Sequence, residues 1–435
     1  MKKKTVSQII LLTVMLVPTL LACQMFEEEE LQPLPTNPVD SPPPATKTQP
    51  PPTSDAVPPT QPAPPPTQPP QKPPLGLGIP HMKAGNEVVI SRIKMFSETR
   101  GWAIGGEEDP GDHILYTIDG GNTWADVTPP ELNPSVGEPE KKAFAFFFDK
   151  TTAWVTYYYL DSFDTPDAPV VWYTTDGGES WAASPSLDTR VSMDFYSPTF
   201  LHFADQNIGW FIVAVGAGMS HQYTVVYKTQ DGGFSWAMIH DPMNSTHLQS
   251  CCKTGLAFAD TQTGLMTFEQ GPYAEPYIEW TYDGGLTWEH ETLQPLSSFP
   301  DMFSNGYCNG HSPHLFSPQM ATFALDCRNF SADTTDYYIY RTQNGGTTWD
   351  GDEYPGGALY CFDADNCFAL SREIHKTTDG GENWAHVSTV YWDGQFSFVN
   401  QQLGWAVARS DDGIALVKTT NGGELWEMLS PVVGE

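Results

Sequence analysis

The chain has 435 residues, of which 17% are charged and 13% aromatic; 39 are Pro and 37 are Gly. This Pro and Gly content excludes a coiled coil or a helical bundle, and 40% apolar residues exclude a chain that is disordered throughout. Lys and Arg number 21 against 53 Asp and Glu, so the formal net charge is −32, which disfavours nucleic acid and anionic lipid surfaces as partners wherever the charge is not locally inverted.

Residues 1–22 have the pattern of a secretory signal: three lysines at positions 2–4 precede a short apolar run from Ile9 to Leu16. The run is too short for a stable membrane span. It ends in Leu20-Leu21-Ala22-Cys23, which resembles the lipobox of bacterial lipoproteins. That resemblance implies a diacylglyceryl group on Cys23, so we expect a protein anchored to a cell membrane and facing away from the cytoplasm. The alternative is an ordinary cleaved signal in which Cys23 is incidental.

Residues 23–86 are predicted to form an extended linker. Four glutamates at 27–30 precede a tract from Pro33 to Pro74 in which 19 of 42 residues are Pro. Proline lacks an N–H donor and fixes φ, so the tract favours polyproline II and cannot bury a core. At about 3.1 Å per residue it is a semi-rigid stalk of at most roughly 130 Å. A Pro-rich recognition ligand is the alternative, but the prolines are diffuse and no arginine flanks them.

Residues 87–435 contain a motif that occurs seven times. Thr stands two residues before an Asp or Asn, Gly-Gly follows directly, and Trp follows five residues after the Asp or Asn. The Asp and Asn positions are Asp119, Asp176, Asp231, Asp283, Asn344, Asp379 and Asn421. The tryptophans are Trp124, Trp181, Trp236, Trp288, Trp349, Trp384 and Trp426. A period of roughly 49 residues is suitable for one blade of a β-propeller.

The motif has the chemistry of a hairpin turn. An Asp or Asn side chain can accept hydrogen bonds from backbone N–H groups ahead of it, and the glycine pair supplies positive φ. A second hairpin precedes it, as in Phe203-Ala204-Asp205 followed by Gly209-Trp210. Two hairpins give four strands, so we predict an all-β protein: a seven-bladed β-propeller of four-stranded antiparallel blades, with Trp and Phe buried between blades.

The first blade is expected near 88–96, 101–105, 114–118 and 123–127. The seventh blade has four strands of its own and ends near 425–429. Ring closure is therefore expected to need little or no strand exchange between the termini.

The pattern Thr-x-Asp-Gly-Gly-x-Thr-Trp resembles the Asp-box, or BNR repeat, of sialidases, sortilin-type receptors and some endoglucanases. Combined with Phe-x-Asp-x-x-x-Gly-Trp, it is most similar to the seven-bladed photosystem II assembly and stability factor family and its bacterial relatives. The resemblance covers about 340 residues, essentially the chain after the linker. It implies a chaperone-like grip on a protein partner. The departures are Asn344 and Asn421 in place of Asp, Asn383 and Leu425 before Trp, and a fifth blade without Gly-Trp.

Apart from Cys23 the chain has six cysteines, an even number that predicts disulfides in an exported protein. Cys361 and Cys367 flank a predicted hairpin turn. Cys308, placed just before the first strand of blade five, is expected opposite Cys327 at the end of the second strand.

Cys251 and Cys252 remain, either as a strained vicinal bridge or as two thiols; a bridge from Cys252 to Cys308 is the fallback. Four residues of blade five could also be taken for zinc ligands: Cys308, His311, His314 and Cys327. An oxidising compartment favours disulfides, so no metal site is predicted there.

The loops opposite the Asp-boxes form the face that holds ligands in related enzymes. They are acidic and partly aromatic, at 107–109, 157–169, 269–275, Asp333, Asp336 and 411–412. Calcium or a cationic partner is possible at this rim, whereas a solvated rim is the simpler interpretation. No other cofactor is predicted.

Three of the seven arginines fall at or near the ends of second strands in blades five, six and seven: Arg328, Arg372 and Arg409. We expect them on this ligand face, where clustered guanidinium groups can bind carboxylates. Trp392 is the unassigned aromatic beside them. Local ion pairing of the arginines is the alternative.

These features favour a monomeric, non-catalytic, lipid-anchored module that binds a protein or glycan partner. The alternative is a glycoside hydrolase of the sialidase or xyloglucanase type that uses the same face. The sialidase Arg-Ile-Pro signature is missing, since Gly78-Ile79-Pro80 lacks the arginine. Endoglucanases of the Asp-box type need two carboxylates across a cleft that usually takes two propellers.

Overall fold

The computed structural model describes residues 79–107, 111–130, 141–159, 169–188, 195–218, 221–243, 248, 252–270, 275–304 and 306–434. The predicted signal and nearly all of the predicted linker, including Cys23, lie outside these ranges. Within them, no helix is long and apolar enough to cross a membrane.

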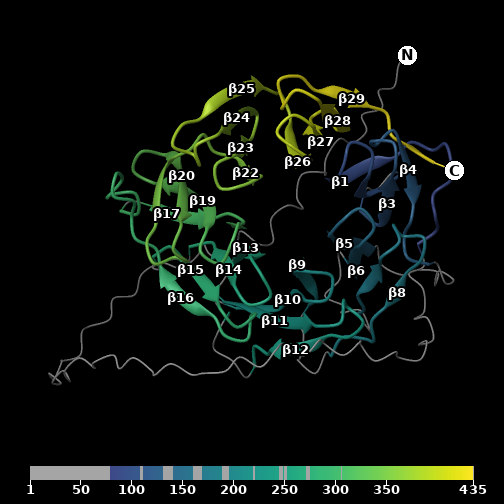
Figure 1. The fold of residues 1–435 in the computed structure, drawn as a ribbon, viewed down its shortest axis with the longest axis horizontal. Helices are drawn as coiled ribbons and strands as arrows, with labels where there is room; N and C mark the ends of the chain where they lie inside the picture. The colour runs from purple at the N-terminus through teal and green to yellow at the C-terminus, as the bar shows by residue number, and fades with distance from the viewer. Residues whose placement is uncertain are drawn as a thin grey trace, which may run out of the picture. The chain divides into compact units, whose positions relative to one another are not determined.

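Seven antiparallel sheets are arranged as blades around a common centre, which confirms the predicted all-β, seven-bladed propeller (Figure 1). Each blade begins near the centre and ends at the periphery with its Asp-box strand. Blade 1 contains β1 (Val89–Met95), β2 (Gly101–Gly106), β3 (His113–Thr117) and β4 (Thr123–Asp126). Blade 2 contains β5 (Lys141–Phe147), β6 (Ala153–Tyr159), β7 (Trp172–Thr174) and β8 (Ala182–Ala183). Blade 3 contains β9 (Ser197–Phe203), β10 (Gly209–Gly218), β11 (His221–Thr229) and β12 (Ala237–His240).

The remaining blades follow the same order. Blade 4 contains β13 (Lys253–Phe258), β14 (Gly264–Phe268), β15 (Tyr277–Thr281) and β16 (Glu289–Thr292). Blade 5 contains β17 (Gly306–Gly310), β18 (His314–Leu315), β19 (Ala321–Asn329), β20 (Thr334–Thr342) and β21 (Asp350–Glu353). Blade 6 contains β22 (Ala358–Cys361), β23 (Cys367–Leu370), β24 (Glu373–Thr377) and β25 (Ala385–Thr389). Blade 7 contains β26 (Asp393–Phe398), β27 (Gly404–Ser410), β28 (Gly413–Thr419) and β29 (Glu427–Leu429).

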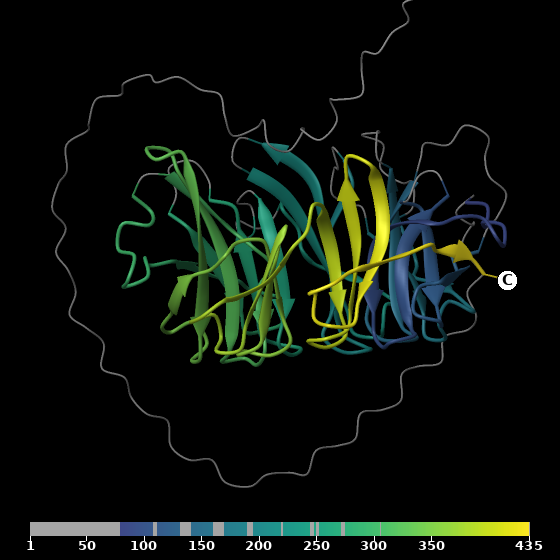
Figure 2. The same cartoon turned by 90° about the horizontal axis from the view of Figure 1, so that it is seen from above.

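Ring closure uses one strand more than the sequence led us to expect. A short C-terminal strand, β30 (Val432–Val433), pairs in parallel with β4 and becomes a fifth strand of blade 1. Figure 2 shows this yellow strand against the blue strands of blade 1. Val433 is buried, and its N–H donates to the carbonyl of Asn86, so the segment before β1 is tied to the C-terminal strand as well.

The Asp-box turns have the hydrogen bonds that their chemistry predicts. In blade 1, the Asp119 carboxylate accepts hydrogen bonds from the N–H and the hydroxyl of Thr123, at 3.0 and 2.8 Å. The Thr117 hydroxyl accepts the N–H of Gly121 at 3.0 Å and donates to Asp119. Both glycines of the box have positive φ, near 80° and 96°. Hydrogen bonds to the side chains of Asp119 and Thr117 therefore hold this turn.

The tryptophans of the first hairpins join neighbouring blades. Trp154 of blade 2 stacks on Phe203 of blade 3 with ring centroids 3.5 Å apart, and its Nε1 donates to the carbonyl of Gly232 in the blade 3 box. Trp210 does the same to Phe258 and Gly284 of blade 4. Both tryptophans are buried. The aromatic core thus lies between blades, as predicted.

Two disulfides have the predicted pairing. Cys361 and Cys367 are bonded across the β22–β23 hairpin, and Cys308 is bonded to Cys327. Cys308 lies inside β17 and directly opposite Cys327 on β19, whereas the sequence placed it before the first strand. The bonded pair breaks the alternative set of four zinc ligands and excludes the fallback bridge from Cys252 to Cys308. Cys252 is disulfide-bonded; Cys251 lies outside the described residues.

Candidate functional site

The three predicted arginines lie on the face opposite the Asp-boxes, each with a local partner. Arg372, in the β23–β24 turn, donates to both carboxylate oxygens of Asp393, at 3.1 and 2.7 Å. Arg409 pairs with Asp393 in the β26–β27 register and donates to the carbonyl of Ser91 at 2.6 Å. Arg328 donates to Asp333 at 2.7 Å within its own hairpin. Arg372 is therefore paired with Asp393, Arg409 lies opposite Asp393 on the neighbouring strand, and Arg328 is engaged separately.

Trp392, the predicted aromatic beside these arginines, contributes to packing. Its ring lies 5.6 Å from that of Trp426 and 5.7 Å from that of Phe396, in the hydrophobic cluster shared by blades 6 and 7. The side chain is half-buried. We therefore assign the Trp392 side chain a structural role in the packing of blades 6 and 7.

A cavity of about 280 Å³ opens beside Arg328 on blade 5. We call it the blade 5 pocket; its lining includes Phe299, Met302, Cys327, Arg328, Asp336 and Tyr338. Phe299 and Met302 come from the connection between blades 4 and 5, and Phe299 lies 5.2 Å from the ring of Tyr338. The pocket thus combines aromatic and thioether surface with one guanidinium and two carboxylates, those of Asp301 and Asp336.

An aromatic pair lies beside the pocket, with one ring exposed and the other half-buried. Phe330, at the tip of the β19–β20 hairpin, is 64% exposed, and its ring lies 5.6 Å from that of Tyr307. Asp333 of the same tip has φ near 55°, a conformation that costs free energy for a residue other than glycine. Its carboxylate meets Arg328 there, so the strained turn places the ion pair at the pocket.

The ion pair of Arg328 and Asp333 is open to solvent, with side chains 50% and 82% exposed. Such pairs stabilise a fold by about 0–1 kcal/mol, so a ligand carboxylate can replace Asp333 at little cost. The disulfide of Cys308 and Cys327 joins the strands beneath, and both cysteines are buried. A rigid, disulfide-tied floor keeps the ordering cost of binding low.

The sequence pointed to Arg328, Asp333 and Asp336 but missed the aromatic half of this site. Phe299 and Met302 lie in an inter-blade loop whose course is set by packing against blade 5. Phe330 could have been noticed, because a large apolar residue is unusual in a predicted polar hairpin tip.

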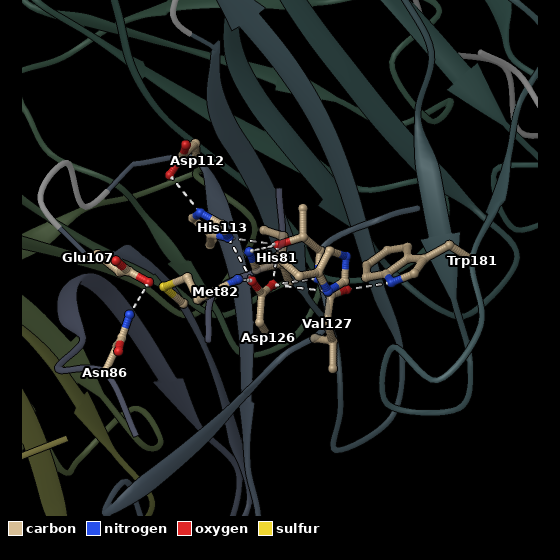
Figure 3. Close-up of polar contacts among 11 residues, drawn as sticks. His81, Met82, Asn86, Glu107, Asp112, His113, Asp126, Val127 and Trp181 are labelled. Carbon is tan, nitrogen blue, oxygen red and sulfur yellow. Dashed lines mark hydrogen bonds and ion pairs between the residues drawn. The ribbon is translucent and has the colours of Figure 1, made fainter. Parts of the chain in front are cut away.

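A second polar cluster, on blade 1, was also missed (Figure 3). His113, at the start of β3, places Nδ1 2.8 Å from the carboxylate of Asp126 at the end of β4. Asp126 also accepts the backbone N–H of Met82 at 2.8 Å and the hydroxyl of Thr128. Asp112 lies 3.7 Å from the other ring nitrogen of His113. The cluster attaches the segment that enters the propeller to blade 1.

Burial and hydrogen bonding shift the pKa values of His113 and Asp126 in opposite directions. Burial alone would lower the pKa of His113, but the hydrogen bond and charge of Asp126 outweigh it and raise that pKa. Burial alone would raise the pKa of Asp126, but the hydrogen bond and charge of His113 and the donors from Thr128 and Met82 lower it to about 2. With side chains 10% and 4% exposed, the pair is a buried ion pair whose role is structural.

The predicted acidic rim is only partly described. Glu107 accepts a hydrogen bond from Asn86 at 2.7 Å, while 108–109, 160–168 and 271–274 lie outside the described residues. Within the described ranges, no group of three or more His, Cys, Asp or Glu is placed to hold a metal ion.

The chain is thus a seven-bladed β-propeller whose blades carry Thr-x-Asp/Asn-Gly-Gly turns and whose opposite face has a pocket lined by charged and aromatic side chains. No family model and no curated protein matches the sequence.

Solved structures with the same kind of fold include three distant ones. The GH74 enzyme of Niastella koreensis is 13% identical, with a TM-score of 0.33 over 78% of this chain and 62% of that one, so the chain spans less than two thirds of its length. An ulvan lyase of polysaccharide lyase family PL25 is 11% identical, with a TM-score of 0.45 over 80% and 96%. Sqt1 of Saccharomyces cerevisiae is 9% identical, with a TM-score of 0.45 over 81% and 87%. At these identities the likeness concerns the fold alone.

Proposed function

We propose that this protein is a binding module that presents the blade 5 pocket to a protein partner outside the cytoplasm. The observation that carries the proposal is the combination, at one rigid place, of a cavity, an exchangeable Arg328 ion pair and the exposed ring of Phe330. Arginine and tyrosine are over-represented where binding energy is concentrated in protein interfaces. The assembly-factor resemblance of the repeats supports a role of this kind.

The proposal includes the anchor expected from the N-terminal sequence. A diacylglyceryl group on Cys23 and the Pro-rich linker would hold the propeller at a distance from the membrane, with the pocket free to meet a membrane or envelope protein. Labelled-lipid incorporation into the wild type, absent in Cys23→Ser, is the expected result. An unlabelled wild-type protein would overturn the anchor.

Site-specific photocrosslinking on live cells tests the pocket. A photoreactive phenylalanine analogue replaces Phe330, which is 64% exposed, or Ile118, which is 66% exposed on the Asp-box face of blade 1. We expect a discrete adduct from position 330 that is lost in an Arg328→Ala background, and none from position 118. Equal adducts from both positions would contradict the proposal.

The same experiment separates a protein partner from a glycan. A protease-sensitive adduct of defined mass supports a protein partner. Adducts that shift only with glycosidase treatment, or turnover of a fluorogenic glycoside that Arg328→Ala abolishes, would replace the proposed function with glycan binding or hydrolysis.

A further inference from the structure

Two cations of blade 1, Arg92 and Lys94, lie on its first strand, β1. The inner strand β1 buries Ile93 and Met95 between blades 7 and 1, so the alternate residues Arg92 and Lys94 point the other way. The Lys94 ammonium lies 5.8 Å from the ring centroids of both Phe96 and Tyr360. Tyr360 belongs to β22 of blade 6, and blade 7 lies between blades 6 and 1 in the ring (Figure 1), so Lys94 approaches a blade that is not the neighbour of its own.

Side chains of blade 7 form hydrogen bonds with the backbone of β1, so the side chains of Arg92 and Lys94 are not needed to hold this strand. The side-chain amide of Gln395 accepts the N–H of Ile93 at 2.8 Å and donates to its carbonyl at 3.2 Å. The hydroxyl of Ser397 accepts the N–H of Met95 at 2.8 Å. These hydrogen bonds from blade 7 hold the backbone on both sides of Lys94 in place.

Within the described part of the chain, neither cation has a hydrogen bond to a carboxylate or an ion pair. Burial lowers the pKa of Arg92, and burial followed by the charge of Arg92 lowers the pKa of Lys94. Arg92 is nevertheless solvent-accessible. His314 of blade 5 is close enough for the charge of Lys94 to help lower the pKa of its ring, which burial lowers first.

This arrangement is unexpected in a chain with 53 acidic and 21 basic residues. Arg328, Arg341 and Arg372 each pair with a carboxylate, whereas Arg92 and Lys94 have no such partner among the described residues. Two cations two residues apart on one strand face are separated by about 6.6 Å along the strand. An anion between them can accept hydrogen bonds from the guanidinium fork and from the ammonium together.

We propose that Arg92 and Lys94 form a binding site, at the centre of the ring, for a small ligand with an oxyanion group: a carboxylate, sulfate or phosphate. The rings of Phe96 and Tyr360 provide apolar surface for the rest of such a ligand. This site shares no residue with the blade 5 pocket, so an experiment can refute one of the two proposals and leave the other standing.

Thermal unfolding of the full chain tests the site, with sodium sulfate, phosphate or acetate titrated at constant ionic strength against chloride. We expect at least one of these probes to raise the Tm of the wild type in a saturable way. The double variant Arg92→Gln/Lys94→Met should weaken the apparent Kd at least tenfold. Lys376→Met, which removes an exposed lysine on β24 of blade 6, should respond like the wild type.

Comparison of the three probes identifies the preferred oxyanion. A linear rise of Tm that is the same in all three proteins is the general salting effect and would overturn the site. Should the double variant fail to fold, Arg92→Gln alone is used, because its side chain is accessible and its loss leaves the packing of Ile93 and Met95 intact. Calorimetric titration of the responding probe should give one site per chain in the wild type, and no measurable site would also overturn the proposal.

Discussion

At the scale of single residues, the carbonyl of the first glycine in the turn accepts a tryptophan N–H from the preceding blade at three places in the ring. Trp154, Trp210 and Trp405 donate to Gly232, Gly284 and Gly120, at 2.8, 2.8 and 2.9 Å. Blade 5 lacks this tryptophan and has Thr322 in its place. Arg341, directly opposite Thr322 on β20, donates to the carbonyl of Gly380 at 2.8 Å and supplies the missing contact.

We therefore predict that Arg341→Met destabilises the protein by about 1–3 kcal/mol, because it leaves a polar carbonyl and two carboxylates without their donor. The Arg341 side chain is 18% exposed and also donates to Asp350 at 2.9 Å and to Asp352 at 3.2 Å. Denaturant unfolding measures the loss. Arg372→Met is the control, since its 61% exposed side chain should cost less than about 1 kcal/mol. Equal losses in the two variants would refute the compensating role.

The buried pair of His113 and Asp126 makes stability depend on pH in a defined window. The pKa of Asp126 falls from 3.8 to about 2 on folding, so its contribution is present above pH 4 and is lost as pH falls toward 2. The pKa of His113 is raised, so its contribution is complete below about pH 6.5 and is lost as pH rises through its folded value. The pair stabilises the fold most between those limits.

Asp126→Asn should accordingly cost about 2 kcal/mol near pH 5.5, with the difference from wild type shrinking at pH 2–3 and again as the pH rises through the raised pKa of His113. Thermal unfolding across pH 2–9 measures this profile. Asp333→Asn is a matched control, because Asp333 is exposed and Asn tolerates its positive φ. A constant difference at all pH values would show that hydrogen-bond geometry, and not charge, explains the loss.

At the scale of strands and hairpins, the sequence predicts what depends on local chemistry. Seven Thr-x-Asp/Asn-Gly-Gly turns predict seven outer hairpins, and the structure has all seven. The Phe and Gly-Trp of an inner hairpin look like partners in the sequence, yet Trp210 stacks on Phe258 of the following blade and Trp154 stacks on Phe203. Which blade a side chain faces is set by the twist of the sheets around the ring, which no single repeat encodes.

The same distinction applies to the candidate sites. Arg328 could be placed because it ends a predicted strand, whereas the pocket beside it needs Phe299 from a loop with no repeat pattern. The pair of His113 and Asp126 lies across one hairpin, but its role depends on Met82, 44 residues away from Asp126. Contacts of this kind follow from packing and cannot be predicted from the repeat.

The two disulfides should differ in their effect on stability, because they close loops of different length. Cys308 and Cys327 are 19 residues apart, and Cys361 and Cys367 are 6 apart. On the loop-entropy model, replacing the first pair by serine costs about 3 kcal/mol and the second about 2 kcal/mol. Unfolding of the two double variants by denaturant measures the order. Only the variant that lacks the Cys308–Cys327 bridge should also give less photocrosslinked adduct at position 330. If that variant keeps its adduct, the floor of the blade 5 pocket is rigid without the bridge.

At the scale of the whole molecule, both ends of the described chain meet on blade 1. The N–H groups of Gly85 and Val88 donate to the carbonyls of Val433 and Pro431, and the N–H of Gly434 donates to the carbonyl of Trp124. The C-terminal strand therefore holds the outer edge of blade 1 and the entering segment together. The same hydrogen bonds therefore close the ring and hold the segment that enters blade 1.

Disruption of β30 should consequently loosen two segments that are far apart in sequence. Val433→Asp places a charge at a position that is 4% exposed and should cost about 2–4 kcal/mol. Hydrogen exchange should then speed up at the backbone N–H groups of 85–88 and at Gly434, while those of blades 3 to 5 keep their protection relative to global unfolding. Met428→Asp, at a position that is 70% exposed on β29, is the control and should leave the same amides protected. If amides 85–88 keep their protection in Val433→Asp, the entering segment is held by the Asp126 cluster alone, and β30 is a peripheral addition to blade 1.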